Sequence, residues 1–151
     1  MLIRIHINIL FFYNGERIEA DVFYRSLYSF AKNTIIIIDD YIGIKTLEHL
    51  KACNKNIQII IFTDNVARPH LAQDYFDDYI NDTGINIVVK KTNNTIHDRL
   101  IIIDYEADNE LIYLCGPSSK DAGNKIASIV SVDNKEIYHP IIEKLIADSK
   151  S

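Results

Sequence analysis

The chain has 151 residues, of which 48% are hydrophobic and 25% charged, so residues 1–151 are expected to form one globular domain with a sizeable core. A formal net charge of −5 argues against a protein that coats nucleic acid nonspecifically, because such proteins are basic overall or on one face. The sequence has neither an apolar run of the ~18–20 residues that a membrane helix needs nor a signal-peptide layout, so we expect a cytoplasmic protein with no membrane partner.

Apolar residues recur with a period of two in some segments and at helical spacing in others. In chain order they predict a half-exposed strand within 2–12, a helix over 20–32, a strand over 34–38, a helix over 44–53, a strand over 57–62 and a helix from Pro69 to about 81. The remainder predicts strands over 85–89, 96–104, 110–115 and 125–132, then a helix over 137–148. Apolar strands that alternate with helices are typical of an α/β fold with a mixed, largely parallel sheet flanked by helices on both faces.

Polar residues stand directly after two of the apolar strands. Asp39, Asp40 and Tyr41 follow the strand over 34–38, and Asp64 follows the strand over 57–62. Ligands of such sheets bind beyond the carboxyl ends of the strands, although the same residues also occur in ordinary loops.

The most informative stretch reads His-Asp-Arg-Leu-Ile-Ile-Ile-Asp, from His97 to Asp104. In a strand, side chains two residues apart share a face, so the imidazole of His97 and the guanidinium of Arg99 should lie side by side. A nitrogen nucleophile beside a phosphate-binding cation suits an attack on phosphorus. The alternative is that the pair belongs to the surface or to an ion pair. By the same parity Asp104 faces away from the pair, which favours a structural role for it.

The spacing of His97, Arg99 and Asp104, followed by Gly116-Pro117-Ser118-Ser119-Lys120-Asp121, resembles the phospholipase D-like superfamily, whose signature is His-x-Lys, four residues, Asp and then a Gly-Ser turn. The lead-in over 34–65 is also similar, and the resemblance covers roughly residues 10–132. It is strongest to a poorly characterised bacterial and phage-associated branch. Three features depart from the family pattern. Arginine replaces lysine at position 99, the gap before Gly116 is longer, and the asparagine of the usual turn is missing.

The resemblance implies a phosphodiesterase of nuclease type that forms a phosphohistidine. Superfamily enzymes use two motifs, so a chain with one motif implies a homodimer in which two His97 side chains meet across a twofold axis. The resemblance assigns the following roles: catalysis to His97, Arg99 and Asp104; phosphate binding to Ser118, Ser119 and Lys120, together with Arg99; and orientation to Asp40, Tyr41 and Asp121.

No cofactor or metal is implied, and Cys53 and Cys115 fit no metal or redox spacing. The alternative to an enzyme is a degenerate domain that keeps the phosphate site for binding nucleic acid or a partner, or that serves only for dimerisation. The negative net charge and Arg99 favour this alternative, whereas the intact His97 favours the enzyme. Lipid hydrolysis is the least favoured reading, because no amphipathic or basic membrane-binding stretch is visible.

Overall fold

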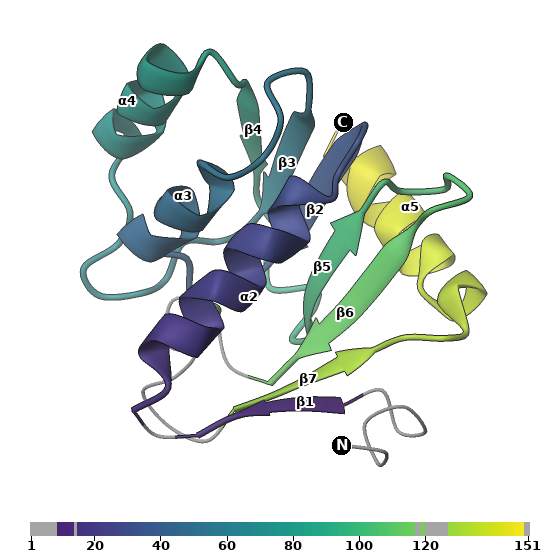
Figure 1. The fold of residues 1–151 in the computed structure, drawn as a ribbon. Coiled ribbons are helices and arrows are strands. Elements are labelled where there is room, and N and C mark those ends of the chain that lie inside the picture. Colours follow the sequence, from purple (N-terminus) through teal and green to yellow (C-terminus); the bar gives the residue numbers. More distant parts are fainter. Residues whose placement is uncertain (1–8, 14, 117–118, 120–126, 150–151) are drawn as a thin grey trace.

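The structure is a computed structural model that describes residues 9–13, 15–116, 119 and 127–149. The elements, labelled as in Figure 1, are β1 (Ile9–Phe12), α2 (Arg17–Ser29), β2 (Thr34–Ile38), α3 (Ile44–Leu50), β3 (Gln58–Phe62), α4 (Gln73–Thr83), β4 (Ile87–Lys90), β5 (Arg99–Ile103), β6 (Leu111–Cys115), β7 (Ala127–Ser131), the 3-10 turn η2 (Lys135–Ile137) and α5 (His139–Asp148). In the described part of the chain, no helix is both long and apolar enough to cross a membrane.

The described strands form one sheet in the order β1-β7-β6-β5-β2-β3-β4. The expected α/β fold with a mixed sheet is therefore confirmed. Parallel pairing is confined to β2–β3 and β3–β4, and the pairs β1–β7, β7–β6, β6–β5 and β5–β2 are antiparallel. Parallel pairs are thus fewer than the sequence predicts. The physical reason is that residues 91–98 and 104–110 join β4 to β5 and β5 to β6 without a crossover helix.

Side-chain parity in the central strands separates two cores. Ile35 and Ile37 of β2 pack with α2, α3 and α4 on one face of the sheet. Ile36 and Ile38 of the same strand pack with Ile142 of α5 on the other face. Helices on both faces are therefore confirmed (Figure 1), and the strands are apolar throughout because both of their faces are buried.

Several predicted boundaries are shifted; the helix expected over 20–32, for example, is found at Arg17–Ser29. Two further differences have a clear local meaning. The helix expected to open at Pro69 begins only at Gln73, because the amide side chain of Asn65 donates to Leu71 O and accepts from Leu71 N, which keeps the preceding segment a loop. The strand expected over 96–104 is shorter and begins at Arg99, so His97 lies in the loop that leads into β5.

Candidate functional site

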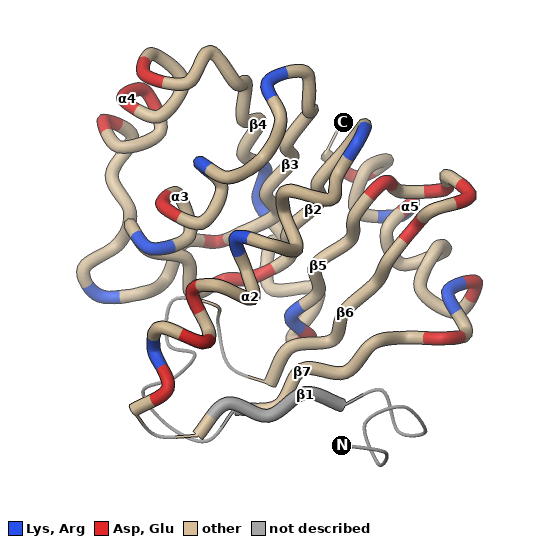
Figure 2. Tube along the Cα trace, viewed as in Figure 1, with Lys and Arg blue, Asp and Glu red and all other residues tan. Residues whose placement is uncertain are grey.

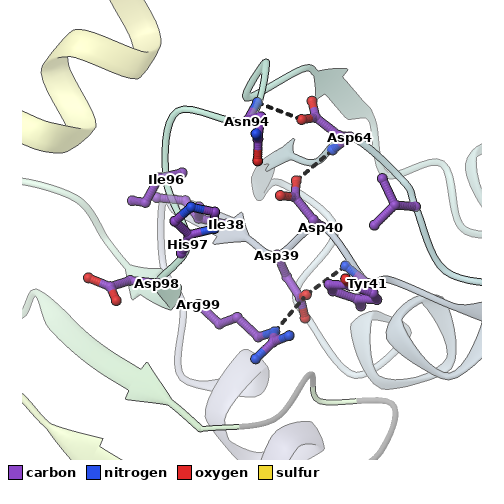
Figure 3. A pocket seen from close by; sticks show the side chains of 11 residues that line it. Ile38, Asp39, Asp40, Tyr41, Asp64, Asn94, Ile96, His97, Asp98 and Arg99 are labelled. Atoms are coloured by element: carbon purple, nitrogen blue, oxygen red, sulfur yellow. Dashed lines mark hydrogen bonds and ion pairs between the residues drawn. The ribbon is translucent and has the colours of Figure 1, made fainter.

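The candidate site lies at the edge of the sheet where β2 and β3 end. Since β5 runs antiparallel to β2, with Ile38 opposite Leu100, the start of β5 lies at this same edge. The loops that meet there enclose a hollow of about 560 Å³, lined by residues of 38–41, 64–66 and 94–99 (Figure 3). The site is thus built where ligands bind in sheets of this type.

His97 lies at the wall of this hollow with an exposed side chain. Neither of its ring nitrogens has a hydrogen-bond partner among the described residues. Arg99 lines the same hollow, so the structure brings together the two side chains that the sequence paired. Both also line a second hollow of about 240 Å³, which reaches Gly116 and Ser128. An imidazole in this setting is open to a substrate.

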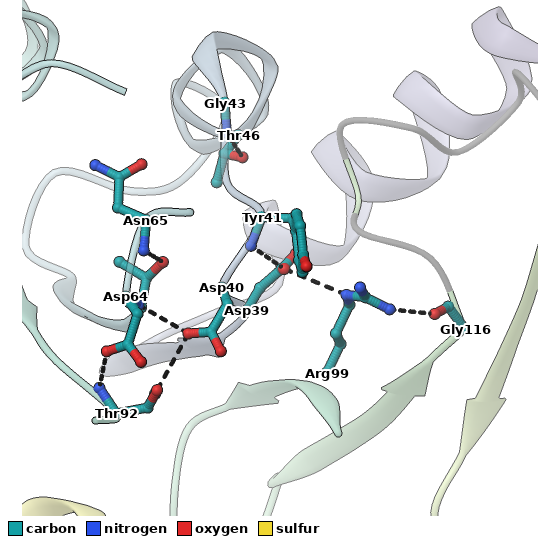
Figure 4. Close-up of polar contacts among 11 residues, drawn as sticks. Asp39, Asp40, Tyr41, Gly43, Thr46, Asp64, Asn65, Thr92, Arg99 and Gly116 are labelled. Carbon is teal, nitrogen blue, oxygen red and sulfur yellow. Dashed lines mark hydrogen bonds and ion pairs between the residues drawn. The ribbon is translucent and has the colours of Figure 1, made fainter. Parts of the chain in front are cut away.

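Three contacts fix the guanidinium of Arg99 (Figure 4). Its Nε lies 3.4 Å from Oδ1 of the nearly buried Asp39, and its Nη1 donates to Gly116 O at 2.7 Å. Its central carbon lies 5.2 Å from the centre of the Tyr41 ring, within cation–π range. The arginine is therefore held in one orientation at the mouth of the site.

The role of Asp39 in holding Arg99 was not predicted from the sequence. It is explained by the register of the sheet: the pairs Ile37–Ile101 and Ile38–Leu100, continued by one residue, place Asp39 opposite Arg99. The odd-numbered residues of both strands face the same core, so the two side chains also share a face. The signal in the sequence was the strand-end position of Asp39, but the pairing of β2 with β5 was needed to interpret it.

Asp40 was expected to orient the imidazole, but its described contacts go elsewhere. Its Oδ1 accepts hydrogen bonds from Asp64 N at 2.8 Å and from the hydroxyl of Thr92 at 3.1 Å. Tyr41, expected in the same role, contacts Arg99. The described residues do not bring Asp40 or Tyr41 into a hydrogen bond with His97.

Asp64 fixes the loop that carries His97. Its carboxylate accepts from Thr92 N and Asn93 N, both at 2.9 Å, and from Asn94 N at 2.7 Å. Burial alone would raise the pKa of Asp64, but these hydrogen bonds outweigh it and lower the pKa. Together with Asp40, this carboxylate ties residues 92–94 to the ends of β2 and β3.

Asp104 lies at the opposite end of β5 from Arg99. It is fully buried, and its carboxylate accepts hydrogen bonds from Asn33 N at 2.7 Å, Lys32 N at 3.0 Å and Thr34 N at 3.1 Å, and from the Asn109 amide. Burial would raise the pKa of Asp104, and these hydrogen bonds reverse the effect and lower it. Asp104 therefore anchors the turn before β2, and the structure does not bring it to His97.

The predicted phosphate-binding turn is only partly described. Ser118, Lys120 and Asp121 lie outside the described residues, and Ser119 is buried. Gly116 N donates to Ser128 O at 3.0 Å, and a Cβ at this glycine would come within 3.3 Å of the same oxygen. Glycine thus allows the end of β6 to lie close to β7 while its own carbonyl holds Arg99.

Within the described part of the chain, no group of three or more histidine, cysteine or acidic side chains is placed to hold a metal ion. Cys115 lies opposite Arg99 in the β5–β6 pair. Burial raises the pKa of its thiol to about 12, which keeps it protonated and a poor nucleophile. His97 is thus the better nucleophile at this edge of the sheet.

No protein-family model matches the sequence, and no curated protein matches it either. Several solved structures resemble this chain in fold. NucT from Helicobacter pylori has a TM-score of 0.64 at 17% identity, with 93% of this chain and 96% of that chain covered. Nuc from Salmonella typhimurium, a phospholipase D family member, has a TM-score of 0.58 at 20% identity, covering 93% and 92%. The archaeal chromatin protein TrmBL2 has a TM-score of 0.53 at 12% identity, covering 95% of this chain and 50% of that one.

These likenesses show the fold. Nuc and NucT match this chain over nearly their full lengths. The chain therefore has a phospholipase D-like fold, as its motif spacing predicts.

Proposed function

We propose that this chain is a metal-independent phosphodiesterase of nuclease type, with an active site that two copies of the chain complete. One observation carries the proposal. On a phospholipase D-like fold, an exposed imidazole without a described partner and a fixed guanidinium line one hollow. The first can attack phosphorus, and the second can hold phosphate oxygens.

In the first step, a ring nitrogen of His97 forms a bond to phosphorus, and the bond from phosphorus to the leaving oxygen breaks. The leaving oxygen takes its proton from a protonated His97 of a second copy. Arg99, held by Asp39 and Gly116, stabilises the charge that develops on the non-bridging oxygens. In the second step, the second copy's imidazole takes a proton from water, the water oxygen bonds to phosphorus, and the phosphorus–nitrogen bond breaks.

A second copy is invoked because this chemistry needs two proton-transferring groups. Among the described residues that line the hollow, His97 is the one imidazole. Asp39 holds Arg99, and the carboxylates of Asp40 and Asp64 accept backbone N–H groups. Figure 3 shows Asp98 projecting away from Asp39. A second His97 across a twofold axis would supply the missing acid.

The experiment is hydrolysis of bis(p-nitrophenyl) phosphate and of DNA and RNA strands in the presence of EDTA. Wild-type protein should cleave, and His97→Asn should lower the rate by about 10³-fold or more, because the nucleophile is lost. His139→Asn is the matched control. His139 is bound to Glu110 at 2.7 Å, beyond the far end of β5, so its loss should lower thermal stability and leave the rate unchanged. Cleavage that survives His97→Asn, or that EDTA abolishes, would exclude the proposed chemistry.

A second candidate function is phosphate-dependent binding of nucleic acid without cleavage. The engagement of Arg99 with Asp39 favours it, because a paired guanidinium has fewer donors for a transferring phosphoryl group. The likeness to TrmBL2, whose structure is described as showing a novel mode of DNA binding, agrees with it. Nucleic-acid binding by wild-type protein that cleaves none of the substrates would select this function.

A further inference from the structure

A third hollow is lined by residues that directly follow those of the active-site hollow along the chain. It measures about 290 Å³, and its lining includes Ile44, Arg68, His70 and Tyr75; we call it the Tyr75 hollow. The two loops that line the active-site hollow run directly into it, through Tyr41 to Ile44 on one side and from Val66 to Arg68 on the other. The loops are joined where Val66 N donates to Asp40 O at 2.8 Å.

Exposed large apolar side chains line both hollows. Tyr41 is 44% exposed, Ile44 48%, Val66 43% and Tyr75 45%. Tyr41 and Val66 belong to the active-site hollow, and Ile44 and Tyr75 to the Tyr75 hollow. Exposed apolar side chains gathered at two neighbouring hollows mark a binding surface more often than a single exposed apolar residue does.

The charges differ between the two hollows. Four aspartates line the active-site hollow, whereas the lining of the Tyr75 hollow, as far as the structure describes it, has no carboxylate. Arg68 and His70 are exposed there, and Arg68 makes no ion pair with any described residue. Acidic residues lie nearby on α4, the helix that carries Tyr75, and on α3, the helix that begins at Ile44 (Figure 2), but none of them lines the Tyr75 hollow.

We infer that the Tyr75 hollow is a subsite for an unpaired nucleotide next to the cleaved phosphodiester, with the base against Tyr75 and Ile44 and its phosphate at Arg68 and His70. The inference rests on the proposed function and names its substrate class: single-stranded nucleic acid. Aromatic rings stack on bases only when the bases are splayed out of a helix. A duplex hides those faces and brings twice the charge to a protein of net charge −5.

The experiment measures binding by the cleavage-deficient His97→Asn protein, using fluorescence anisotropy. The probes are labelled dT10 and rU10, an abasic decamer with the same phosphates, and a ten-base-pair duplex. At least one of the two single strands should bind about ten-fold more tightly than the abasic decamer, as expected for stacking on an aromatic residue. The duplex should bind more weakly than that strand. Comparing dT10 with rU10 distinguishes a DNA from an RNA strand.

Variants then test which residues cause the tighter binding of a strand that carries bases. Two variants are made separately in the His97→Asn protein: Tyr75→Ala and Ile44→Ala. Each should remove most of the difference in affinity between the preferred strand and the abasic decamer. Phe30→Ala is the matched control, because Phe30 is an exposed aromatic residue at the end of α2, outside both hollows. Its removal should leave the difference unchanged.

Equal binding of both single strands and the abasic decamer would overturn the subsite, as would tighter binding of the duplex. So would Tyr75→Ala or Ile44→Ala protein that becomes monomeric by light scattering while its base preference persists, since these side chains would then belong to a subunit contact. Absence of phosphodiester cleavage by wild-type protein would instead overturn the proposed function. The base preference could still be measured, because the binding experiment does not depend on cleavage.

Discussion

Arg99 stands where the phospholipase D-like signature has lysine, and its surroundings fit an arginine. The flat guanidinium meets the Asp39 carboxylate, the Gly116 carbonyl and the face of Tyr41 at the same time. An ammonium group is a point charge and cannot reproduce these three directions. At this position the site is thus adapted to the residue that it carries.

Arg99→Lys should therefore keep part of the activity, about ten-fold below wild type, whereas Arg99→Met should lose about 10²–10³-fold because no cation remains. Phosphodiesterase rates under saturating substrate measure this difference. Arg99→Met also removes an ion pair from the nearly buried Asp39 and should lower stability. The double variant Arg99→Met/Asp39→Asn should regain stability in urea unfolding without regaining activity. Recovery of activity in the double variant would mean that Arg99 serves only to neutralise the charge of Asp39.

At the scale of elements, carboxylates bind the backbone of the loop that leads into β5 and of the turn beside the strand's far end. Asp64 holds the turn before the strand, and Asp104 holds the turn before β2. Strand parity and the apolar runs of the sequence were enough to predict the strands and to suggest a structural role for Asp104. They could not show that β5 lies beside β2, because strand order depends on packing between segments far apart in the chain. The partnership of Asp39 with Arg99 therefore could not be predicted.

Asp104→Asn should lower the free energy of unfolding by about 2–3 kcal/mol, because an amide cannot accept all of the N–H groups that the carboxylate satisfies. Urea unfolding at pH 7 measures this change. The folded-state pKa of Asp104 is lowered, so its stabilisation is complete above the ordinary aspartate pKa of about 3.9 and is lost as the pH falls through the folded-state pKa. The variant should consequently lose less stability than wild type on acidification from about pH 5 to pH 3.

Asp108→Asn is the control for this variant, because Asp108 is exposed in the loop after β5; its effect should stay within about 0.5 kcal/mol. Folded Asp104→Asn protein should also keep its phosphodiesterase rate at 25 °C. A large loss of rate in protein that is still folded would show that Asp104 takes part in catalysis.

At the scale of the whole molecule, the proposed chemistry needs two imidazoles, whereas the described residues of the hollow include one. The motif spacing predicts the nucleophile and its cation, and the fold places them in one hollow. The single motif led us to expect the second imidazole from another copy, but neither the sequence nor one chain's structure shows how two copies would pack. A test must therefore measure whether activity depends on pairs of chains.

Mixing wild-type with His97→Asn chains provides that test. After equal amounts have exchanged subunits, random pairing leaves about a quarter of the dimers with two imidazoles, so activity per wild-type chain should fall to about half. Mixing wild type with Asp108→Asn chains should leave the activity per chain unchanged, since Asp108 is exposed and lies outside the hollow. Activity should fall because a mixed dimer has one His97 and one asparagine at this position. Whichever chain supplies the histidine, either the nucleophile or the proton donor is missing, so the reaction cannot be completed. Activity that stays proportional to the number of wild-type chains would show that each chain builds its own complete site.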